Sequence, residues 1–397
     1  MPVGLDFTEV SHVKVFNHIV PRIGASYDLF GDGNTVLKGN WGRFYFNPGV
    51  NLADSVNPNT ANQYFDYVWN DLNDDRIFQE GEQGALQTRF GGVANAAIDP
   101  DLENAYTDEA SVFVERAVLR DLGVRVGYVY KKDKNGWQQV NILRPFSAYN
   151  APVTVIDPGP DGDVTTTSDN SPFSFLNLAD PSNGSSQLTS NIDGYEGTYK
   201  TIELSARKRF AQRWSMNASF SYTWTHEFGN NYANNRFGTA ISNFAFFGSF
   251  PSTPNEYTEN HFTNWLVKFS GTIDAGWDIF VTPALKMSSG TPYGRSFPVA
   301  GCSTTVVTNC SNYGPQLVLV EPLGTRRQDN IAILDMRIEK KIVFADRGRL
   351  GLFLDIYNAL NADTLVNINW RSGGSFEKAT TVVGPRILKF GVKFDWS

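Results

Sequence analysis

Residues 71–82, DLNDDRIFQEGE, carry oxygen-bearing side chains at the spacing that a cation-binding loop uses. An EF-hand-type loop takes its ligands from positions 1, 3, 5, 7, 9 and 12, and a glutamate at position 12 binds the ion with both oxygens. The residues at these positions are Asp71, Asn73, Asp75, Ile77 (through its carbonyl), Gln79 and Glu82. Arg76 stands where such loops have glycine. We expect a structural Ca²⁺ site here, the alternative being an acidic, solvated loop.

The stretch 157–170, DPGPDGDVTTTSDN, is a weaker candidate for the same chemistry. Two glycines allow this loop to fold tightly, so that its carboxylates converge on one cation. The carboxylates are those of Asp157, Asp161, Asp163 and Asp169. Turn formation explains the same residue types without any ion.

A third candidate is an aromatic cluster within residues 234–257. Exposed apolar clusters often mark binding surfaces, and aromatic rings suit an apolar or sugar-like ligand. The cluster consists of Phe237, Phe244, Phe246, Phe247 and Phe250. The alternative is a loop that packs on its own side chains.

Cys302 and Cys310 bracket a polar stretch, STTVVTN, and favour a local disulfide formed in an oxidising compartment over two free thiols. The first residues contain no basic region followed by an apolar core, so they do not read as a signal peptide. A disulfide implies export to an oxidising compartment, whereas a start without a signal peptide does not. The two agree only if the natural N-terminus lies upstream of Met1.

Composition and motif context argue against several other functions. A formal net charge of -7 disfavours wholesale nucleic-acid binding. The four histidines are scattered and lack both a catalytic-triad context and metal-ligand spacing, so we expect no enzyme. No run of about 18 apolar residues predicts a transmembrane helix.

The elements that must position these residues are long strands with alternating faces. The closing stretch ILKFGVKFDW alternates apolar with polar or small residues, a period of two that fits a strand and not a helix. The same alternation recurs in about eleven segments, most of nine residues or more, the length that crosses a bilayer as a tilted strand. The segments are 19–29, 35–47, 109–119, 122–131, 199–209, 213–225, 263–274, 278–289, 330–344, 348–358 and 385–396.

The connections between these segments alternate between tight turns and long polar loops. The long loops are expected at 48–108, 132–198, 226–262, 290–329 and 359–384. An outer-membrane barrel has short turns on its periplasmic side and long loops outside, whereas a soluble sandwich has no reason to gather its long loops at one end. Charged residues such as Arg125, Glu203 and Lys268 would be buried at high cost in a sandwich but are accommodated in a wet lumen.

The sequence therefore predicts an all-β, antiparallel transmembrane β-barrel of outer-membrane type with about 11–12 strands. Eleven antiparallel strands cannot close a barrel without a parallel seam, and single-chain bacterial barrels have an even strand number. Either residues 1–18 hide a further strand, or residues 1–397 are the C-terminal portion of a larger barrel. We expect the second.

Several stretches, in order along the chain, resemble the C-terminal part of TonB-dependent outer-membrane receptors, especially the Oar-like branch with an N-terminal carboxypeptidase-regulatory-like domain. They are PRIGASYDLFGDGNTVLKGNWGRFY, PDLENAYTDEASVFVERAVLRDLGVRVGYVYKKDKN, YKTIELSARKRFAQRWSMNASFSYTWT, SSGTPYGR and FLDIYNALN followed by PRILKFGVKF. The resemblance implies a 22-stranded barrel with a plugged lumen that imports scarce nutrients with energy relayed from the inner membrane.

We accordingly expect this chain to be about half of a receptor barrel in the bacterial outer membrane, binding an unknown small ligand through its loops. The expected partners are outer-membrane lipid, the N-terminal plug and barrel half that this chain lacks, and the TonB system acting through that plug. Transport by this polypeptide alone is not expected. The alternatives are a stand-alone, porin-like channel of about twelve strands and a soluble, calcium-stabilised β adhesin.

Overall fold

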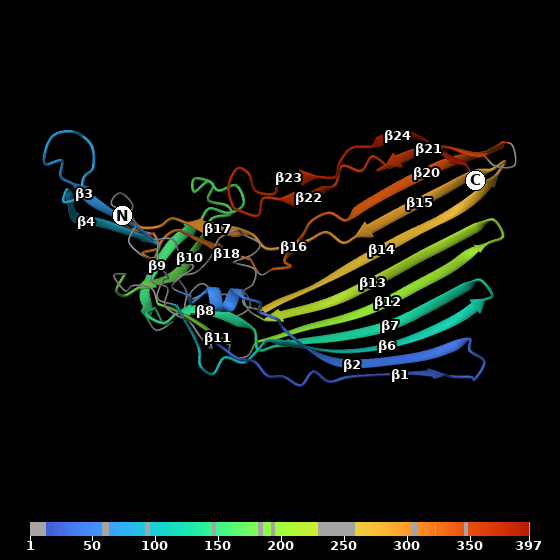
Figure 1. Cartoon of the computed structure of the whole chain (residues 1–397), viewed down its shortest axis with the longest axis horizontal. Helices are drawn as coiled ribbons and strands as arrows, with labels where there is room; N and C mark the ends of the chain where they lie inside the picture. Colours follow the sequence, from blue (N-terminus) through green and yellow to red (C-terminus); the bar gives the residue numbers. More distant parts are fainter. Residues whose placement is uncertain are drawn as a thin grey trace.

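A large antiparallel sheet dominates the computed structural model (Figure 1). The structure describes residues 13–57, 63–91, 96–144, 148–181, 186–191, 195–228, 259–303, 308–321, 323–344 and 348–396. The sheet has eleven strands, and neighbours along the chain are neighbours in the sheet. They are β1 (Arg22–Asp28), β2 (Thr35–Tyr45), β6 (Tyr106–Leu119), β7 (Leu122–Lys134), β12 (Glu196–Ala211), β13 (Trp214–Phe228), β14 (Glu259–Gly276), β15 (Ile279–Ser288), β20 (Ile331–Phe344), β21 (Gly348–Tyr357) and β24 (Ile387–Trp396).

All eleven predicted strands are confirmed, and several are longer than predicted. β12 begins at Glu196 and β14 begins at Glu259, so both extend beyond the apolar alternation into the loop side. Hydrogen bonding to a neighbouring strand continues where the side-chain pattern has become polar, which is why the sequence underestimates these lengths.

The two faces of the sheet differ as the alternation predicts. Residues directly opposite one another on adjacent strands share a face. One continuous row is apolar: Val114, Val126, Leu204, Phe220, Val267 and Met287. Val126 is 50% exposed and Leu204 42%, and Phe220, Val267 and Met287 are half-buried, so this face, called the outer face below, needs an apolar solvent to cover it.

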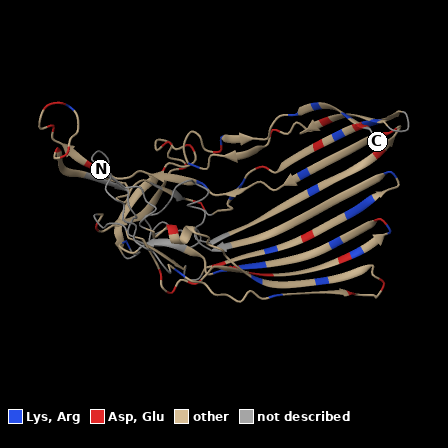
Figure 2. Ribbon diagram, viewed as in Figure 1, with Lys and Arg blue, Asp and Glu red and all other residues tan. Residues whose placement is uncertain are grey.

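The opposite face, called the inner face below, is polar. Its corresponding row is Glu115, Arg125, Ser205, Ser219, Lys268 and Lys286. Figure 2 shows acidic and basic residues spread along these strands. A shift of one residue in the pairing of two strands would move apolar side chains to the polar face and charged ones to the apolar face. Because this shift is unfavourable, the register is strongly specified.

Tight turns join the strands at one end of the sheet, and the long loops lie at the other (Figure 1). The turn between β12 and β13 has two left-handed residues, Gln212 (φ 49°) and Arg213 (φ 72°). Trp277 (φ 50°) and Asp278 (φ 57°) repeat this pattern between β14 and β15. Two successive positive φ angles are typical of the hairpin turn whose twist matches the flanking strands.

The sheet is not closed into a barrel. Within the described residues, β1 pairs only with β2 and β24 pairs only with β21. Because all ten pairings between the eleven strands are antiparallel, β1 and β24 run in the same direction. The two edges therefore cannot meet in an antiparallel seam.

Much of the expected loop sequence forms small sheets. One helix, α1 (Asn51–Asp54), is a single turn, and no helix among the described residues is long and apolar enough to cross a membrane. The loop strands are β3 (Gln63–Trp69), β4 (Gln83–Gly91), β5 (Ala96–Ile98), β8 (Trp137–Asn141), β9 (Tyr149–Asp157), β10 (Ser171–Leu178), β11 (Gln187–Asn191), β16 (Pro292–Tyr293), β17 (Ser296–Val299), β18 (Gln316–Leu319), β19 (Arg326–Arg327), β22 (Leu365–Ile368) and β23 (Ala379–Val382).

The buried core lies among these loops and not in the large sheet. It joins the β9–β10 hairpin to residues near β17 and β18 that lie more than a hundred positions away along the chain. The core residues are Tyr149, Val155, Phe175, Leu178, Val299 and Tyr313. We call this loop assembly, residues 148–178 with 291–303, 308–321 and 365–382, the cap.

Candidate functional site

Two adjoining hollows lie where the cap meets the sheet. One, of about 400 Å³, is lined by Tyr293, Arg326, Arg327, Gln328, Asp329, Leu365, Ile368 and Glu377. The other, of about 550 Å³, is lined by Thr291, Asn367, Ile368, Asn369, Trp370, Arg371 and Thr380. They share Ile368, and Tyr293 stacks on Trp370 with ring centroids 5.5 Å apart. We call the two together the vestibule.

A hydrogen-bonded set of charges forms one wall of the vestibule. The Tyr293 hydroxyl donates to Glu377 Oε1 at 2.7 Å, and Arg326 Nη1 donates to the same oxygen at 3.0 Å. Arg326 also donates twice to Glu321, at 2.7 and 3.0 Å. Burial of Tyr293 and its bond to Glu377 raise the pKa of its hydroxyl well above the usual range. The phenol therefore remains a neutral donor throughout the physiological range.

A buried ion pair links three loops behind this wall. Arg295 donates to both carboxylate oxygens of Asp157, at 2.6 and 2.7 Å, and both side chains are almost inaccessible. Arg295 also donates to Ser372 Oγ at 2.7 Å, and its backbone N–H donates to Glu321 at 3.1 Å. Bidentate geometry of this kind holds the loops in one arrangement. Sequence reasoning missed Arg295, because its partner is 138 positions away.

The predicted calcium loop, residues 71–82, joins β3 to β4 at the end of the molecule farthest from the tight turns (Figure 1). Asp71 accepts hydrogen bonds from the backbone N–H groups of Asp75 and Arg76, at 3.2 and 2.9 Å. Asp74 (φ 59°) and Arg76 (φ 60°) are both left-handed. Arg76 thus adopts the turn that glycine makes in the sequence motif, at a backbone cost of about 1–2 kcal/mol.

Glu82, predicted to bind the ion with both oxygens, already has three donors. It accepts from Trp69 Nε1 at 3.0 Å, from the Gln79 N–H at 3.0 Å and from the Leu72 N–H at 3.2 Å. These bonds, the one from Trp69 foremost, lower the pKa of the Glu82 carboxyl. In this arrangement Glu82 holds the base of the loop closed.

The second acidic stretch is similarly engaged within the protein. Asp157 pairs with Arg295, and Asp163 accepts from the Thr165 N–H and hydroxyl, both at 2.8 Å, which lowers the pKa of its carboxyl. Asp169 lies against Gly159, where an added Cβ would come within 2.2 Å of its carboxylate. Across the described part of the chain, no three His, Cys, Asp or Glu side chains are grouped so as to hold a metal ion.

The remaining predicted site residues divide into two groups. Cys302 and Cys310 form a disulfide with an S–S distance of 2.02 Å, as the sequence predicts. The five phenylalanines of the aromatic cluster, Phe237, Phe244, Phe246, Phe247 and Phe250, lie outside the described residues.

The rings of His226 and His261 stack on adjacent strands, with their centroids 4.2 Å apart. Among the described residues this contact is not part of a catalytic arrangement.

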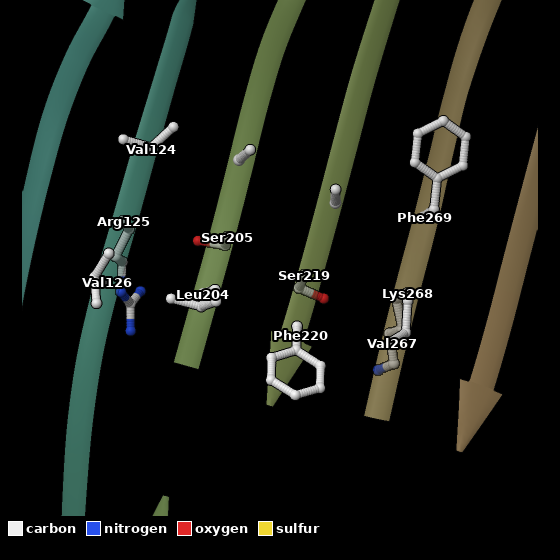
Figure 3. A pocket seen from close by; sticks show the side chains of 12 residues that line it. Val124, Arg125, Val126, Leu204, Ser205, Ser219, Phe220, Val267, Lys268 and Phe269 are labelled. Carbon is white, nitrogen blue, oxygen red and sulfur yellow. The ribbon is translucent and has the colours of Figure 1, made fainter. Parts of the chain in front are cut away.

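The wall itself has a shallow hollow of about 460 Å³ across β7, β12, β13 and β14 (Figure 3). Each strand contributes three consecutive residues, two from the outer face and one from the inner face. The outer-face members include the short side chains of Ala206 and Ala218 between Val124 and Phe269. An apolar hollow of this kind on the outer face suits a hydrocarbon chain.

These features favour binding over chemistry: the described hollows are lined by hydrogen-bonding and aromatic groups, without an activated nucleophile beside a base.

Three solved structures are similar over 95% of this chain. The outer membrane transporter YddB from Escherichia coli has 12% identity and a TM-score of 0.46, with 40% of its length covered. The ferripyoverdine receptor of Pseudomonas aeruginosa has 9% identity, a TM-score of 0.42 and 32% covered. The siderophore receptor PirA from Acinetobacter baumannii has 8% identity, a TM-score of 0.45 and 40% covered.

The chain thus spans less than half the length of these solved structures. A comparison with curated proteins finds no match to the sequence. A family described as outer membrane beta barrel domain matches residues 12–265, well over half of the chain. Together with the apolar outer face and polar inner face of the sheet, this match identifies the chain as a member of the outer membrane beta barrel domain family, located in the bacterial outer membrane.

Proposed function

We propose that this chain supplies part of the barrel wall and the ligand-capturing cap of a TonB-dependent receptor. The observation that carries the proposal is the vestibule, a pair of polar and aromatic hollows at the loop end of a membrane-spanning sheet. Ligand would bind there before entering the lumen. The coupling to TonB is proposed because the sequence resembles that of TonB-dependent receptors.

The open sheet supports the part of the proposal that concerns partners. β1 and β24 run the same way, so the strands that close the barrel must be odd in number to give an even total. We propose that they belong to the same receptor as an N-terminal barrel half, together with a plug that contacts TonB. The ligand is a small molecule that the Tyr293, Arg326 and Glu377 wall recognises through hydrogen bonds.

Fractionation of source cells tests this proposal. An antibody raised against residues 71–82, the outermost described loop, would be used on outer-membrane, inner-membrane and soluble fractions. A heat-modifiable outer-membrane band far above 44.1 kDa is the expected result. A band near 44.1 kDa in the same fraction would instead support a stand-alone, porin-like channel. A soluble band would contradict the membrane assignment and support the adhesin.

We also propose that the 71–82 loop takes up Ca²⁺. The support is the pair of left-handed residues at its fourth and sixth positions, with the oxygens of Asp71 and Asp75 on the same turn. Because Glu82 is engaged elsewhere, we expect an affinity in the weak, extracellular range of about 10⁻⁴–10⁻³ M. Calorimetry on the folded protein would show uptake that Asp75→Asn abolishes and Glu80→Gln, a nearby exposed change, retains. No heat at millimolar Ca²⁺ in the unmodified protein would rule out the site.

A further inference from the structure

Several cations on the inner face have an acidic partner on the neighbouring strand, whereas others, such as Arg22, Arg207 and Lys341, form no ion pair with a described residue. The pairs are Lys38 with Glu115 at 2.7 Å, Lys131 with Glu109 at 2.9 Å, Arg125 with Glu203 at 3.3 Å and Arg337 with Asp355 at 2.6 Å. This pairing is the ordinary way in which a sheet places charges side by side. Such a pair is electrically neutral, whereas an unpaired cation on the same face keeps its charge.

Lys268 on β14 and Lys286 on β15 depart from this arrangement. They are directly opposite one another in the register, and neither forms an ion pair with any residue that the structure describes. Directly opposed side chains have Cβ atoms about 4.5–5.5 Å apart, and two like charges at that spacing repel. The wall thus carries a double positive charge that its own acidic groups do not compensate.

The nearest candidate acid on the next strand is already engaged. Asp335 on β20 is two positions along from Ile333, the residue opposite Lys286. Its Oδ1 accepts the backbone N–H of Asn358 at 2.8 Å, which holds the carboxylate toward the loop after β21. Asp335 therefore does not pair with Lys286, and both lysines are exposed.

Groups that bind anions lie on the Lys268 side of the lysine pair. Ser205 and Ser219 lie in the same inner-face row as Lys268, and Figure 3 labels all three on neighbouring strands. Arg207 lies one inner-face row away on β12, exposed and without a described acidic partner. Adjacent strands are about 4.8 Å apart, so the Ser219 hydroxyl, one strand from Lys268, lies within reach of a small anion bound at the lysine pair.

We propose that Lys268 and Lys286 form an anion-binding site on the inner wall for a small polyanion bearing carboxylate or phosphate groups. One charged group lies between the two ammonium groups, and a second reaches toward Ser219. Binding removes the repulsion between the lysines, so the site is selective for anions with two or more charges. The site is separate from the vestibule and independent of the proposed coupling to TonB.

Titration calorimetry with citrate, on the detergent-solubilised outer-membrane protein that contains this chain, at low ionic strength, tests the proposal. Lys268→Gln and Lys286→Gln are each expected to weaken citrate binding at least tenfold, and Lys268→Arg to retain it. The matched control is Lys38→Gln, because Lys38 is on the same face but is neutralised by Glu115. The control is expected to leave citrate affinity unchanged. Strand content by circular dichroism confirms that each variant is folded.

Three results would overturn the proposal. One is citrate binding that is equal in the unmodified protein and in the Lys268→Gln, Lys286→Gln double variant. Another is an equal loss in Lys38→Gln, which would indicate nonspecific charge. The third is that a hexaglutamate peptide binds through these lysines but citrate does not, which would identify the occupant as an acidic polypeptide segment and not a small anion.

Discussion

The substitution Asp157→Asn is expected to open the cap while leaving the wall intact. It removes one charge from a pair whose side chains are 9% and 3% exposed and whose two hydrogen bonds are 2.6 and 2.7 Å long. The Arg295 guanidinium is then buried without a full counter-charge, since Glu321 lies 3.6 Å from its Nε and is also bound by Arg326. Losing one partner of a buried ion pair costs about 3–5 kcal/mol. Because asparagine still accepts one hydrogen bond, the lower end, about 3 kcal/mol, is expected.

Hydrogen exchange is the assay, because the same loops are joined by backbone bonds. The Ser296 N–H donates to the Trp370 carbonyl at 2.9 Å, and the Ser372 N–H donates to the Ser296 carbonyl at 2.8 Å. A loss of about 3 kcal/mol corresponds to exchange faster by on the order of 100-fold at these amides. Amides of β13 should exchange at the unmodified rate. Asp161→Asn, an exposed change in the same loop, is the control.

A double variant separates charge from packing. Asp157→Leu combined with Arg295→Met replaces the pair by apolar groups and should restore most of the protection, because the uncompensated charge is gone. If Asp157→Asn leaves exchange at Ser296 and Ser372 unchanged, the ion pair does not hold the cap and the reasoning is wrong. The same conclusion follows if β13 loses protection to the same extent, since the cap would then have no independent stability.

Three further predictions concern the loop, a turn and the wall. The pKa of the Glu82 carboxyl is lowered in the folded state, so Glu82 stabilises the 71–82 loop above its ordinary pKa of 4.5. This stabilisation is lost as the pH falls through the folded-state pKa. Trp69 fluorescence should report this acid transition, and Glu82→Gln should remove it. Replacing Gln212 (φ 49°) by asparagine should stabilise the turn by up to about 1 kcal/mol, measured by urea unfolding in detergent. Leu204→Lys on the outer face should destabilise the folded barrel by about 2–4 kcal/mol in bilayers, whereas Ser205→Lys on the inner face should cost far less.

The wall could be predicted from the sequence because its signal is local and repeated. Each strand alternates over nine residues or more, and β24 shows this with Phe390 and Val392 between Lys389, Gly391 and Lys393. Lipid and water impose that alternation independently on every strand, so no knowledge of partners is needed. The tight turns followed from the short intervals between alternating segments.

The cap could not be predicted because its determinants are distant in sequence. β16 and β19 have two residues each and carry no periodicity, yet they position Tyr293 and Arg326 in the vestibule. Asp157 was predicted as a metal ligand from its acidic neighbours, but its charge is matched by Arg295. The partners of Glu82 were also not predictable from the motif. Trp69 Nε1 and two backbone N–H groups donate hydrogen bonds to the carboxylate oxygens that the motif assigns to an ion.

The cap and the wall are stabilised by different interactions. The wall is held by continuous backbone hydrogen bonding between strands, which must persist in lipid because no water is present to replace it. The cap is held by its buried core, by the Arg295–Asp157 ion pair and by a few backbone hydrogen bonds between loops, such as those of Ser296 with Trp370 and Ser372. These interactions are separate from the ladders of the wall, so we expect the cap to open locally at a lower free-energy cost than the wall. A ligand that competes for Arg326 or Glu377 would therefore loosen or tighten the cap directly, and hydrogen exchange at Ser296 should report its binding.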